Sequence, residues 1–413
     1  MIHPDILVIG GGAAGFFAAI QAATSNPDAN VWILERASDV LGKVRISGGG
    51  RCNVTHHCFE PKALTSYYPR GGKSLIGSFS RFNPRHTVTW FAERGVALKT
   101  EADGRMFPAT DSSETIIQCL TEAAKKAGVV VKTKCGLRKL TPLNIAGWRV
   151  TTSDGQVINA AKVLIATGSN ATIWQQLADL GHTIEPPIPS LFTFNTHDTR
   201  LAGLAGITVP FTTIRVVGTK LQAEGPLLVT HWGLSGPGIL RLSAWGARLL
   251  NDVHYRFTIE INFMGKATEN EVLSLFEQQR TLHPRKNIGT IPLWGLPTRL
   301  WQSLTGAAQC DTIRWAEASK KHLQRLAQQC VKAQFEVSGK STNKDEFVTC
   351  GGVRLSEVDF RTMESKRFPG LYFAGEVLDV DALTGGFNFQ HAWTSGYIAG
   401  SAMIERWVAR QLA

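Results

Sequence analysis

A glycine cluster close to the N-terminus constrains the fold more than any other feature of the sequence. Residues 6–9 (ILVI) have the composition of a buried strand, residues 10–15 (GGGAAG) contain the pattern G-x-G-x-x-G, and the helix-forming stretch FFAAIQAA follows. In such a strand–turn–helix unit, Gly10 allows the tight turn, Gly12 lets the backbone approach a pyrophosphate, and Gly15 lets the helix pack closely on the strand. The pattern predicts a Rossmann-type dinucleotide site.

A second strand followed by an acid strengthens this interpretation. Residues 31–34 (VWIL) form another short apolar run, and Glu35 comes directly after it. A carboxylate at this place accepts hydrogen bonds from ribose hydroxyls and repels a 2′-phosphate. FAD or NAD is therefore favoured over NADP. The alternative is that the glycine cluster only forms a turn and binds no ligand.

The segment after the second strand contains three consecutive glycines, Gly48 to Gly50, followed by Arg51, Cys52 and Asn53. Consecutive glycines expose backbone N–H groups, which suits contact with a phosphate or a flavin. Arg51 and Asn53 add side-chain donors. Cys52 is either a reactive thiol or, as is commoner, a small buried packing residue.

Cysteine and histidine usage excludes other classes of site. His56, His57 and Cys58 lie near Cys52, but their spacing matches no standard zinc motif, so we expect no metal. The seven cysteines contain no C-x-x-C pair, which suits a reducing compartment. Without a signal peptide or an apolar run of about 18 residues, we expect a soluble cytoplasmic protein and no membrane contact. The sequence does not indicate an oligomeric state.

The far end of the chain repeats the logic of the first glycine motif. Residues 371–376 (LYFAGE) predict a buried strand ending at Glu376, with Asp379 close behind it, and the pair Gly385-Gly386 precedes a helix expected to begin near Asn388. A helix N-terminus aimed at the N1/C2=O edge of a flavin would stabilise its anionic reduced form. The alternative is an ordinary C-terminal Rossmann helix with polar capping groups.

The middle of the chain has a different hydrophobic pattern from the two ends. Residues 253–263 alternate between apolar and polar side chains, which predicts a half-exposed antiparallel strand. Residues 269–283 and 311–335 have helical patterns, and a further helix is expected to open at the capping cluster 111–114 (DSSE).

We therefore predict an α/β fold in which a Rossmann-type FAD-binding domain, a parallel sheet with helices on both faces, is interrupted by an insert. The expected FAD-binding parts are residues 1–190 and 346–413. The expected substrate domain is 191–345, with an antiparallel β part over 191–265 and a helical part over 266–345.

Positive charge is concentrated in two segments of a chain whose formal net charge is +11. Residues 43–105 contain 11 Lys and Arg against 4 acids, and residues 266–345 contain 12 against 7. Aromatic residues lie among the first set, a combination typical of RNA-binding surfaces. A solvated basic face is the equally weighted alternative.

Further motifs make a family resemblance specific. They are KVRISGGGRCNVT (43–55), GRMFP (104–108), VLIATG (163–168), THWGLSGPGIL (230–240), VTCGGV (348–353) and LYFAGEVLDVDALTGGFNFQHAWTSG (371–396). In this order, from residue 5 to about 400, they resemble the family of FAD-dependent oxidoreductases that includes a bacterial 23S ribosomal RNA dihydrouridine synthase and a 3-dehydro-Δ4,6 steroid reductase of bile-acid metabolism.

The resemblance implies FAD as the cofactor and places its contacts. It assigns the adenosine and pyrophosphate to the first glycine motif and Glu35, the ribityl chain to Glu376 or Asp379, and the flavin end to both later glycine motifs. The full expected set is Gly10, Gly12, Ala13, Ala14, Gly15, Glu35, Arg36, Lys43, Gly49, Arg51, Asn53, Thr167, Gly168, Gly375, Glu376, Asp379, Gly385, Gly386, Phe387 and Asn388.

The chemistry expected from the resemblance is hydride transfer from the flavin to an electron-poor C=C, followed by protonation. His231 is the first candidate for proton donor or carbonyl polariser, Arg51 for carbonyl or phosphate contact, and Cys52 for a catalytic thiol. Residues 233–238 do not form a second dinucleotide fingerprint, so NAD(P)H, the expected reductant, would dock only transiently.

Three functions stay open at this point. The first is reduction of uridine in ribosomal RNA, which we prefer because of the basic segments. The second is reduction of a small conjugated enone such as a steroid. The third is a non-enzymatic RNA-binding protein in which FAD is structural.

Overall fold

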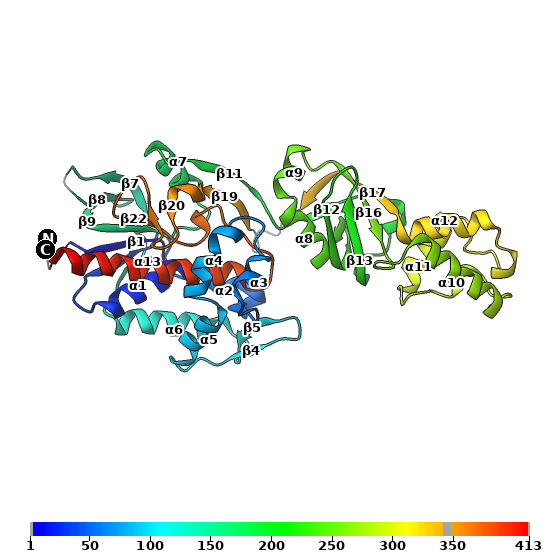
Figure 1. The fold of residues 1–413 in the computed structure, drawn as a ribbon, viewed down its shortest axis with the longest axis horizontal. Coiled ribbons are helices and arrows are strands. Elements are labelled where there is room, and N and C mark those ends of the chain that lie inside the picture. Colours follow the sequence, from blue (N-terminus) through cyan, green and yellow to red (C-terminus); the bar gives the residue numbers. More distant parts are fainter. Residues whose placement is uncertain (1–2, 145, 342–347, 412–413) are drawn as a thin grey trace. The chain divides into compact units, whose positions relative to one another are not determined.

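The computed structural model describes residues 3–144, 146–341 and 348–411, which fold into two compact units. The first unit comprises Met1–Pro187 and Val348–Ala413, and the second comprises Ile188–Phe347. The chain therefore leaves the first unit once and returns to it once. The helix and strand labels below are those of Figure 1.

The first unit is built on a seven-stranded sheet of order β20-β21-β22-β10-β1-β2-β6. Its strands are β1 (Ile6–Ile9), β2 (Val31–Leu34), β6 (Val130–Lys132), β10 (Lys162–Ile165), β20 (Val358–Asp359), β21 (Glu364–Ser365) and β22 (Leu371–Phe373). The five strands from β22 to β6 are parallel, and β20 and β21 form an antiparallel edge. The short apolar runs of β1, β10 and β22 are buried throughout, as strands of a covered parallel sheet must be.

Helices and a small antiparallel sheet cover the parallel sheet. Figure 1 shows α1 (Ala13–Ser25), α6 (Ser113–Lys126) and α13 (Phe387–Gln411) together along one side, and β7 to β9 with α7 (Ala171–Asp179) along the other. Helix α6 begins after Ser112, whose side chain accepts a hydrogen bond from the Glu114 amide, so the expected helix start is confirmed. The helices α1 and α13 lie at opposite ends of the sequence and pack closely against each other. They can do so because Gly396 and Gly400 have no Cβ, which would otherwise clash with the backbone of α1.

The remaining elements of the first unit are short. They are α2 (Gly42–Gly50), β3 (Thr55–His56), α3 (Pro61–Thr65), α4 (Gly72–Arg81), α5 (Pro84–Ala92), β4 (Leu98–Thr100), β5 (Arg105–Pro108), β7 (Leu137–Pro142), β8 (Trp148–Thr152), β9 (Val157–Ala160), β11 (Ile184–Pro189) and β19 (Thr349–Val353). Strands β11 and β19 pair with each other at the points where the chain passes to the second unit and back.

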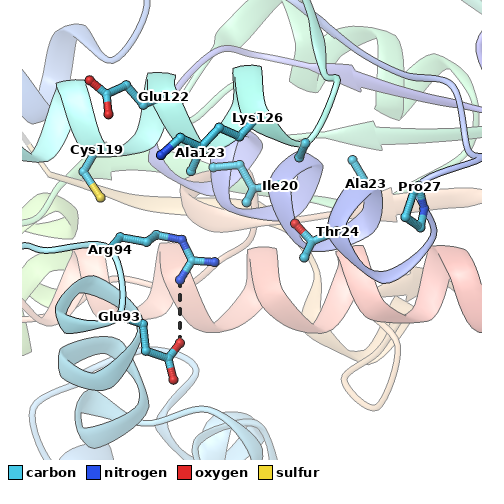
Figure 2. A pocket seen from close by; sticks show the side chains of 11 residues that line it. Ile20, Ala23, Thr24, Pro27, Glu93, Arg94, Cys119, Glu122, Ala123 and Lys126 are labelled. Carbon is cyan, nitrogen blue, oxygen red and sulfur yellow. Dashed lines mark ion pairs between the residues drawn. The ribbon is translucent and has the colours of Figure 1, made fainter.

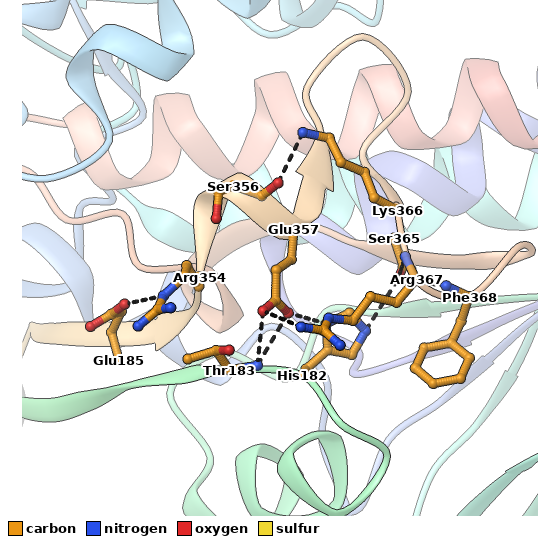
Figure 3. Close-up of polar contacts among 10 residues, drawn as sticks. All are labelled: His182, Thr183, Glu185, Arg354, Ser356, Glu357, Ser365, Lys366, Arg367 and Phe368. Atoms are coloured by element: carbon orange, nitrogen blue, oxygen red, sulfur yellow. Dashed lines mark hydrogen bonds and ion pairs between the residues drawn. The ribbon is translucent and has the colours of Figure 1, made fainter.

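A polar network centred on Glu357 joins residues on either side of these two strands in sequence (Figure 3). His182 Nδ1 lies 2.9 Å from Glu357, and the Thr183 amide donates to the same carboxylate. Arg367 adds a third donor to it at 3.1 Å. Burial alone raises the pKa of the Glu357 carboxyl, but the hydrogen bonds outweigh it and lower that pKa to about 2.

The second unit is an antiparallel sheet with two groups of helices. The sheet order is β17-β16-β13-β14-β15-β12-β18. Its strands are β12 (Thr193–Asn195), β13 (Thr208–Val216), β14 (Gln222–Thr230), β15 (Gly233–Ser235), β16 (Phe257–Asn262), β17 (Ala333–Val337) and β18 (Gly339–Ser341). Its helices are α8 (Pro237–Trp245), α9 (Ala247–Asp252), α10 (Glu269–Leu282), α11 (Thr298–Ala307) and α12 (Lys320–Val331).

Two sequence-based boundaries in this unit are wrong. The strand expected over 253–263 begins only at Phe257, because His254 and Tyr255 have left-handed backbone angles that form a turn. The helix expected over 311–335 is α12 alone, because Ser319 and His322 form a capping box at its start and Lys332 ends it. The residues that follow alternate between buried and exposed side chains and form β17. The helix α10 lies where the sequence predicts it.

Among the helices that the structure describes, none combines the length and the apolar character that a membrane-spanning segment needs.

Candidate functional site

The turn between β1 and α1 accepts only glycine at two positions. Gly10 has φ +110°, and a Cβ there would lie 2.4 Å from the carbonyl oxygen of Ala166. A Cβ on Gly15 would lie 2.0 Å from the carbonyl oxygen of Gly10. These contacts bring the turn against the end of β10, so the first glycine motif is fixed by close packing of backbone on backbone.

Gly12 differs from its neighbours because nothing lies within 4 Å of the Cβ it lacks. It is the N-cap of α1, makes no side-chain capping bond, and is followed by a first turn without acids, which opens with Ala13 and Ala14. The first amides of a helix that is capped in this way are available to an anion, and the helix dipole favours one there. The opening of α1 is therefore shaped for a pyrophosphate.

Glu35 is held at the end of β2 by two backbone amides. The Gly11 amide donates to its Oε2 at 2.8 Å and the Ala37 amide to its Oε1 at 2.9 Å. Each carboxylate oxygen keeps a lone pair for a further donor such as a ribose hydroxyl. The neighbouring Arg36 is exposed, and its Cβ lies 3.0 Å from where a Cβ of Gly136 would be.

The ends of β10 and β22 meet the start of α2 at a salt bridge. Lys43 Nζ lies 2.5 Å from Glu376 Oε2, and both atoms are within 4 Å of the Cβ position of Gly168. The hydroxyl of Thr167 is buried there without a hydrogen-bond partner among the described residues. A bound ligand atom would satisfy this hydroxyl.

Glu376 and Asp379 were both expected near the ribityl chain. Glu376 follows Gly375, whose amide donates to Ser395 on α13 at 2.9 Å and whose φ is +73°. Asp379 is partly exposed, and its amide donates to the Val353 carbonyl. The contact with Lys43 places Glu376, rather than Asp379, beside Gly168.

The triple glycine lies where α2 loses helical geometry. Ser47 has an extended ψ of 149°, and Gly48, Gly49 and Gly50 all have positive φ. Nothing lies within 4 Å of the Cβ positions of Gly49 and Gly50, as at Gly12. The loop therefore presents open backbone, as the sequence indicates.

The surroundings of Arg51 and Cys52 do not favour the roles expected for them, a carbonyl or phosphate contact for Arg51 and a catalytic thiol for Cys52. The Arg51 guanidinium pairs with Glu101 at 2.7 Å and Asp111 at 3.5 Å and stacks 4.0 Å from the Phe107 ring. The hydrogen bond with Glu101 raises the pKa of Arg51. Cys52 is fully buried, and burial raises the pKa of its thiol to about 12, which argues against a catalytic thiolate.

Asn53 connects the two late glycine motifs. With its amide oriented to satisfy both groups, it donates to the Thr55 carbonyl at 3.1 Å and accepts from the Gly386 amide at 3.0 Å. Gly386 has φ +86°, and a Cβ on it would lie 2.5 Å from the Thr55 carbonyl oxygen. Gly385 is restricted in the same way, since its Cβ would meet the Phe387 ring at 2.6 Å. Segments more than 300 residues apart thus share one backbone contact.

Helix α13 begins at Phe387, one residue before the expected start. Asn388 uses its side-chain amide on Ala382, donating to the carbonyl at 3.1 Å and accepting from the amide at 3.0 Å. It therefore shapes the loop before the helix. The Phe387 ring stacks on Tyr67 at 4.2 Å and on His56 at 4.6 Å.

Two histidines at this site are not among the cofactor or catalytic residues predicted from the sequence. His56 Nε2 lies 3.1 Å from the Asp103 carbonyl oxygen, and its buried Nδ1 has no partner among the described residues. His391 on α13 lies 3.3 Å from the Gly375 carbonyl oxygen, and its Nδ1 is likewise buried and without a partner. Burial lowers the pKa of both, that of His391 to about 4. The sequence could have indicated His391, because it lies within the C-terminal motif of residues 371–396.

His231 lies in the second unit, in the exposed turn between β14 and β15. The neighbouring Trp232 is 44% exposed, and its indole donates to Thr193 Oγ1 at 3.2 Å. The turn is fixed by Gly233, whose Cβ would lie 2.2 Å from the Phe194 carbonyl oxygen.

A separate cavity of about 700 Å³ opens between α1, α6 and the chain after α5 (Figure 2). Arg94 and Lys126 face it together with Glu93, Glu122 and apolar residues of α1. None of the residues expected to bind cofactor or substrate lines it, so it is not part of the site described above.

The open backbone at Gly12 and Gly49 and the partnerless hydroxyl of Thr167 fit a dinucleotide with a flavin end. The comparisons with known proteins agree. The family described as HI0933-like protein Rossmann domain matches residues 4–402. The chain belongs to this family. It is thus a Rossmann-type flavoprotein of an oxidoreductase family, which confirms the resemblance seen in the sequence and the predicted fold class.

Named relatives match over almost the whole chain. A 3-dehydro-bile acid delta(4,6)-reductase of Clostridium scindens is 27% identical, covering 97% of this chain and 98% of the relative. Ribosomal RNA dihydrouridine synthases of Escherichia coli and Haemophilus influenzae are 28% and 29% identical, covering 97% and 96% of this chain and 98% and 97% of theirs.

Solved structures share the fold. A 3-ketosteroid-delta4-(5alpha)-dehydrogenase from Rhodococcus jostii has a TM-score of 0.52 at 16% identity, covering 97% of this chain and 96% of that one. A 3-ketosteroid delta1-dehydrogenase from Sterolibacterium denitrificans has a TM-score of 0.51 at 12% identity, covering 98% and 99%.

Proposed function

We propose that the protein is a FAD-dependent reductase of an electron-poor C=C and that its substrate is uridine in ribosomal RNA, which it converts to dihydrouridine. The observations that carry the proposal are the open backbone at Gly12 and Gly49, the buried Thr167 hydroxyl without a partner among the described residues, and the contact of Asn53 with Gly386 before α13. Two relatives whose names state this activity, at 28% and 29% identity over nearly the full chain, support the choice of substrate.

Bound FAD would supply the hydride that reduces the double bond. The residues of the chain bind and orient the cofactor. The first turn of α1 receives the pyrophosphate, Glu35 accepts from the ribose, and Glu376 with Lys43 meets the ribityl region. Arg36, Asp379, Phe387 and Asn388 border these contacts.

The N-terminus of α13 gives the flavin end its electrostatic setting. It follows Gly385 and Gly386, and its first turn carries no acid. A helix N-terminus favours negative charge beside it, so it would stabilise the reduced anionic state of a flavin placed there.

His231 remains the proposed proton donor or carbonyl polariser, supplied by the second unit as the substrate domain. Arg51 is the second candidate for a carbonyl contact, although two carboxylates already hold its guanidinium. NAD(P)H is the proposed reductant, which would bind transiently because the sequence has one dinucleotide fingerprint.

The test is mass spectrometry of 23S ribosomal RNA from a strain that lacks the gene, with the gene restored as control. We expect one dihydrouridine to disappear and to return on complementation. An unchanged dihydrouridine content contradicts the RNA substrate. A His231→Ala variant that keeps full turnover would eliminate the proposed proton donor.

A small conjugated enone is the alternative substrate, and the bile-acid reductase of 27% identity favours it. This function predicts NAD(P)H oxidation in the presence of a dienone steroid and no affinity for RNA. The two functions are thus separated by one titration with RNA and one turnover assay.

A further inference from the structure

The helical part of the second unit ends in two loops that lie side by side. Figure 1 shows α10, α11 and α12 gathered together in this unit. The Trp315 amide donates to the Lys286 carbonyl at 3.0 Å, and the Ala316 amide to the Pro284 carbonyl at 3.1 Å. The Ile288 amide donates to the Ile313 carbonyl at 2.9 Å. The loop after α10 and the loop before α12 therefore form one surface.

This surface is basic. We call it the basic tip and define it by five exposed side chains. They are Arg285, Lys286, Arg314, Lys320 and Lys321. The first three come from the paired loops, and the two lysines open α12.

Folding does not account for this concentration of charge. Arg314 has a long ion pair with Glu317 at 3.5 Å, but the structure gives no acidic partner to the other four among the residues that it describes. Lys320 and Lys321 also lie at the N-terminus of α12, where the helix dipole disfavours cations, and its first turn has no acid. Like charges held together in this way weaken the folded state unless an anion joins them.

The scaffold under the charges is rigid. Ile288 and Trp315 are fully buried, and the Trp301 indole donates to the Ile288 carbonyl at 2.8 Å. The Trp315 ring packs on Phe276 of α10 with centroids 5.7 Å apart. Ile288, Trp301 and Trp315 therefore face inward, and the cationic side chains stand on a backbone that is packed from below.

We propose that the basic tip binds the phosphate backbone of the RNA substrate. The inference rests on the proposed function for the identity of the polyanion. A protein partner would need apolar or aromatic anchors at the centre of the surface. Phosphate contacts need only cationic donors held in register, and they position the RNA without reading its sequence. The tip supplies donors of this kind.

The test compares two triple variants of the full-length, FAD-loaded protein. The tip variant carries Arg285→Gln, Lys286→Gln and Lys321→Gln. The matched control carries Lys220→Gln, Arg241→Gln and Arg256→Gln, which remove the same charge from exposed sites of the same unit that lie outside α10, α11 and α12 and the loops that join them. The probe is an unmodified transcript of 23S ribosomal RNA, and its affinity is measured over a range of salt concentrations.

We expect the tip variant to bind the transcript about tenfold or more weakly, with the slope of log affinity against log salt reduced by about 2. The control should keep the wild-type slope, and both variants should keep the wild-type flavin content. Equal affinity of the tip variant and the control would overturn the inference. Polyglutamate that competes as well as RNA at equal charge would overturn the choice of RNA over an acidic protein.

The outcomes also separate this inference from the proposed function. A wild-type protein that binds RNA through the tip but forms no dihydrouridine would refute the substrate and keep the surface. A tip variant that binds RNA normally while the wild type forms dihydrouridine would refute only the surface. A wild-type protein without RNA affinity would refute both.

Discussion

Two regions of this chain carry excess positive charge, and their basic residues differ in how many have acidic partners. Residues 43–105 have 11 basic residues, of which seven form ion pairs. Those seven are Lys43, Arg45, Arg51, Arg70, Arg94, Lys99 and Arg105. Among the described residues of 266–345, four basic residues form such pairs, namely Lys266, Arg280, Arg314 and Lys332, and in the basic tip only Arg314 does. Net charge along the sequence therefore does not by itself show how the basic residues of a segment are used.

Two ion pairs of the first region join it to a distant part of the chain. Lys43 pairs with Glu376, and Arg70 pairs with Asp381, whose side chain is fully buried. Both acids belong to the loop between β22 and α13. Two of the basic residues of 43–105, Lys43 and Arg70, thus tie this segment to the loop between β22 and α13.

The largest effect is expected from Arg70→Met. The substitution removes the guanidinium that faces the buried Asp381 carboxylate, which should destabilise the protein by about 3–5 kcal/mol. Urea unfolding measures the loss, and the double variant with Asp381→Leu should recover a large part of it. A change below 1 kcal/mol would show that this ion pair does not hold the two segments together.

Acid should weaken the protein through Glu357, a carboxylate with basic partners. Its pKa is lowered to about 2 in the folded protein, so its stabilising effect is complete above the ordinary pKa of about 4.5 and is lost as the pH falls toward 2. The loss amounts to at most about 3 kcal/mol.

Melting temperatures at pH 7 and pH 3 measure this effect. The lowered pKa of His182, which burial causes, adds a loss of the same sign below pH 6.5. Glu357→Gln should be less stable at pH 7 and less sensitive to acid. An unchanged slope against pH in this variant would contradict the assignment.

Lys43→Gln should weaken FAD binding about three- to tenfold with little effect on unfolding, because the ion pair with Glu376 is partly exposed. Fluorescence titration of the flavin-free protein with FAD measures the affinity. RNA affinity should stay at the wild-type value, which is the opposite of the result expected for the tip variant. A loss of RNA affinity in Lys43→Gln would show that the segment 43–105 also binds RNA, as proposed for the basic tip.

The smallest effect is expected from Arg45→Gln. Arg45 and Glu114 are half-exposed, so their pair should contribute less than about 1 kcal/mol to stability. Neither flavin content nor RNA affinity should change. A large drop in either would show that exposed pairs in this segment also serve the site.

The parallel sheet and the glycine motifs could be predicted because their causes are local. A strand that is buried on both faces appears in the sequence as a short apolar run. A turn that needs positive φ usually appears as a glycine. The strand start at Phe257 and the helix start at Lys320 could not be placed, since the turn at His254 and the capping box at Ser319 depend on geometry that composition does not display.

The roles of single side chains were harder to predict for the same reason. Arg51 looked like a free donor because Glu101 and Asp111, its partners, are distant in sequence. Asn388 is predicted to contact the cofactor, but the sequence does not show that its side-chain amide also bonds to the backbone of Ala382. His56 was weighed only as a metal ligand, because its stacking on Phe387 joins segments far apart in the chain.

The flavin content of the purified protein, compared with that of Gly386→Ala, tests most directly whether both ends of the chain grip one cofactor. A Cβ at this position would lie 2.5 Å from the Thr55 carbonyl oxygen, whereas Gly42→Ala, the control, meets nothing within 4 Å. We predict the absorption spectrum of bound FAD, near one per chain, in the wild type and in the control, and its loss in Gly386→Ala. A wild-type protein that stays colourless after incubation with FAD, or a Gly386→Ala variant that binds it as tightly as the wild type, would contradict the account.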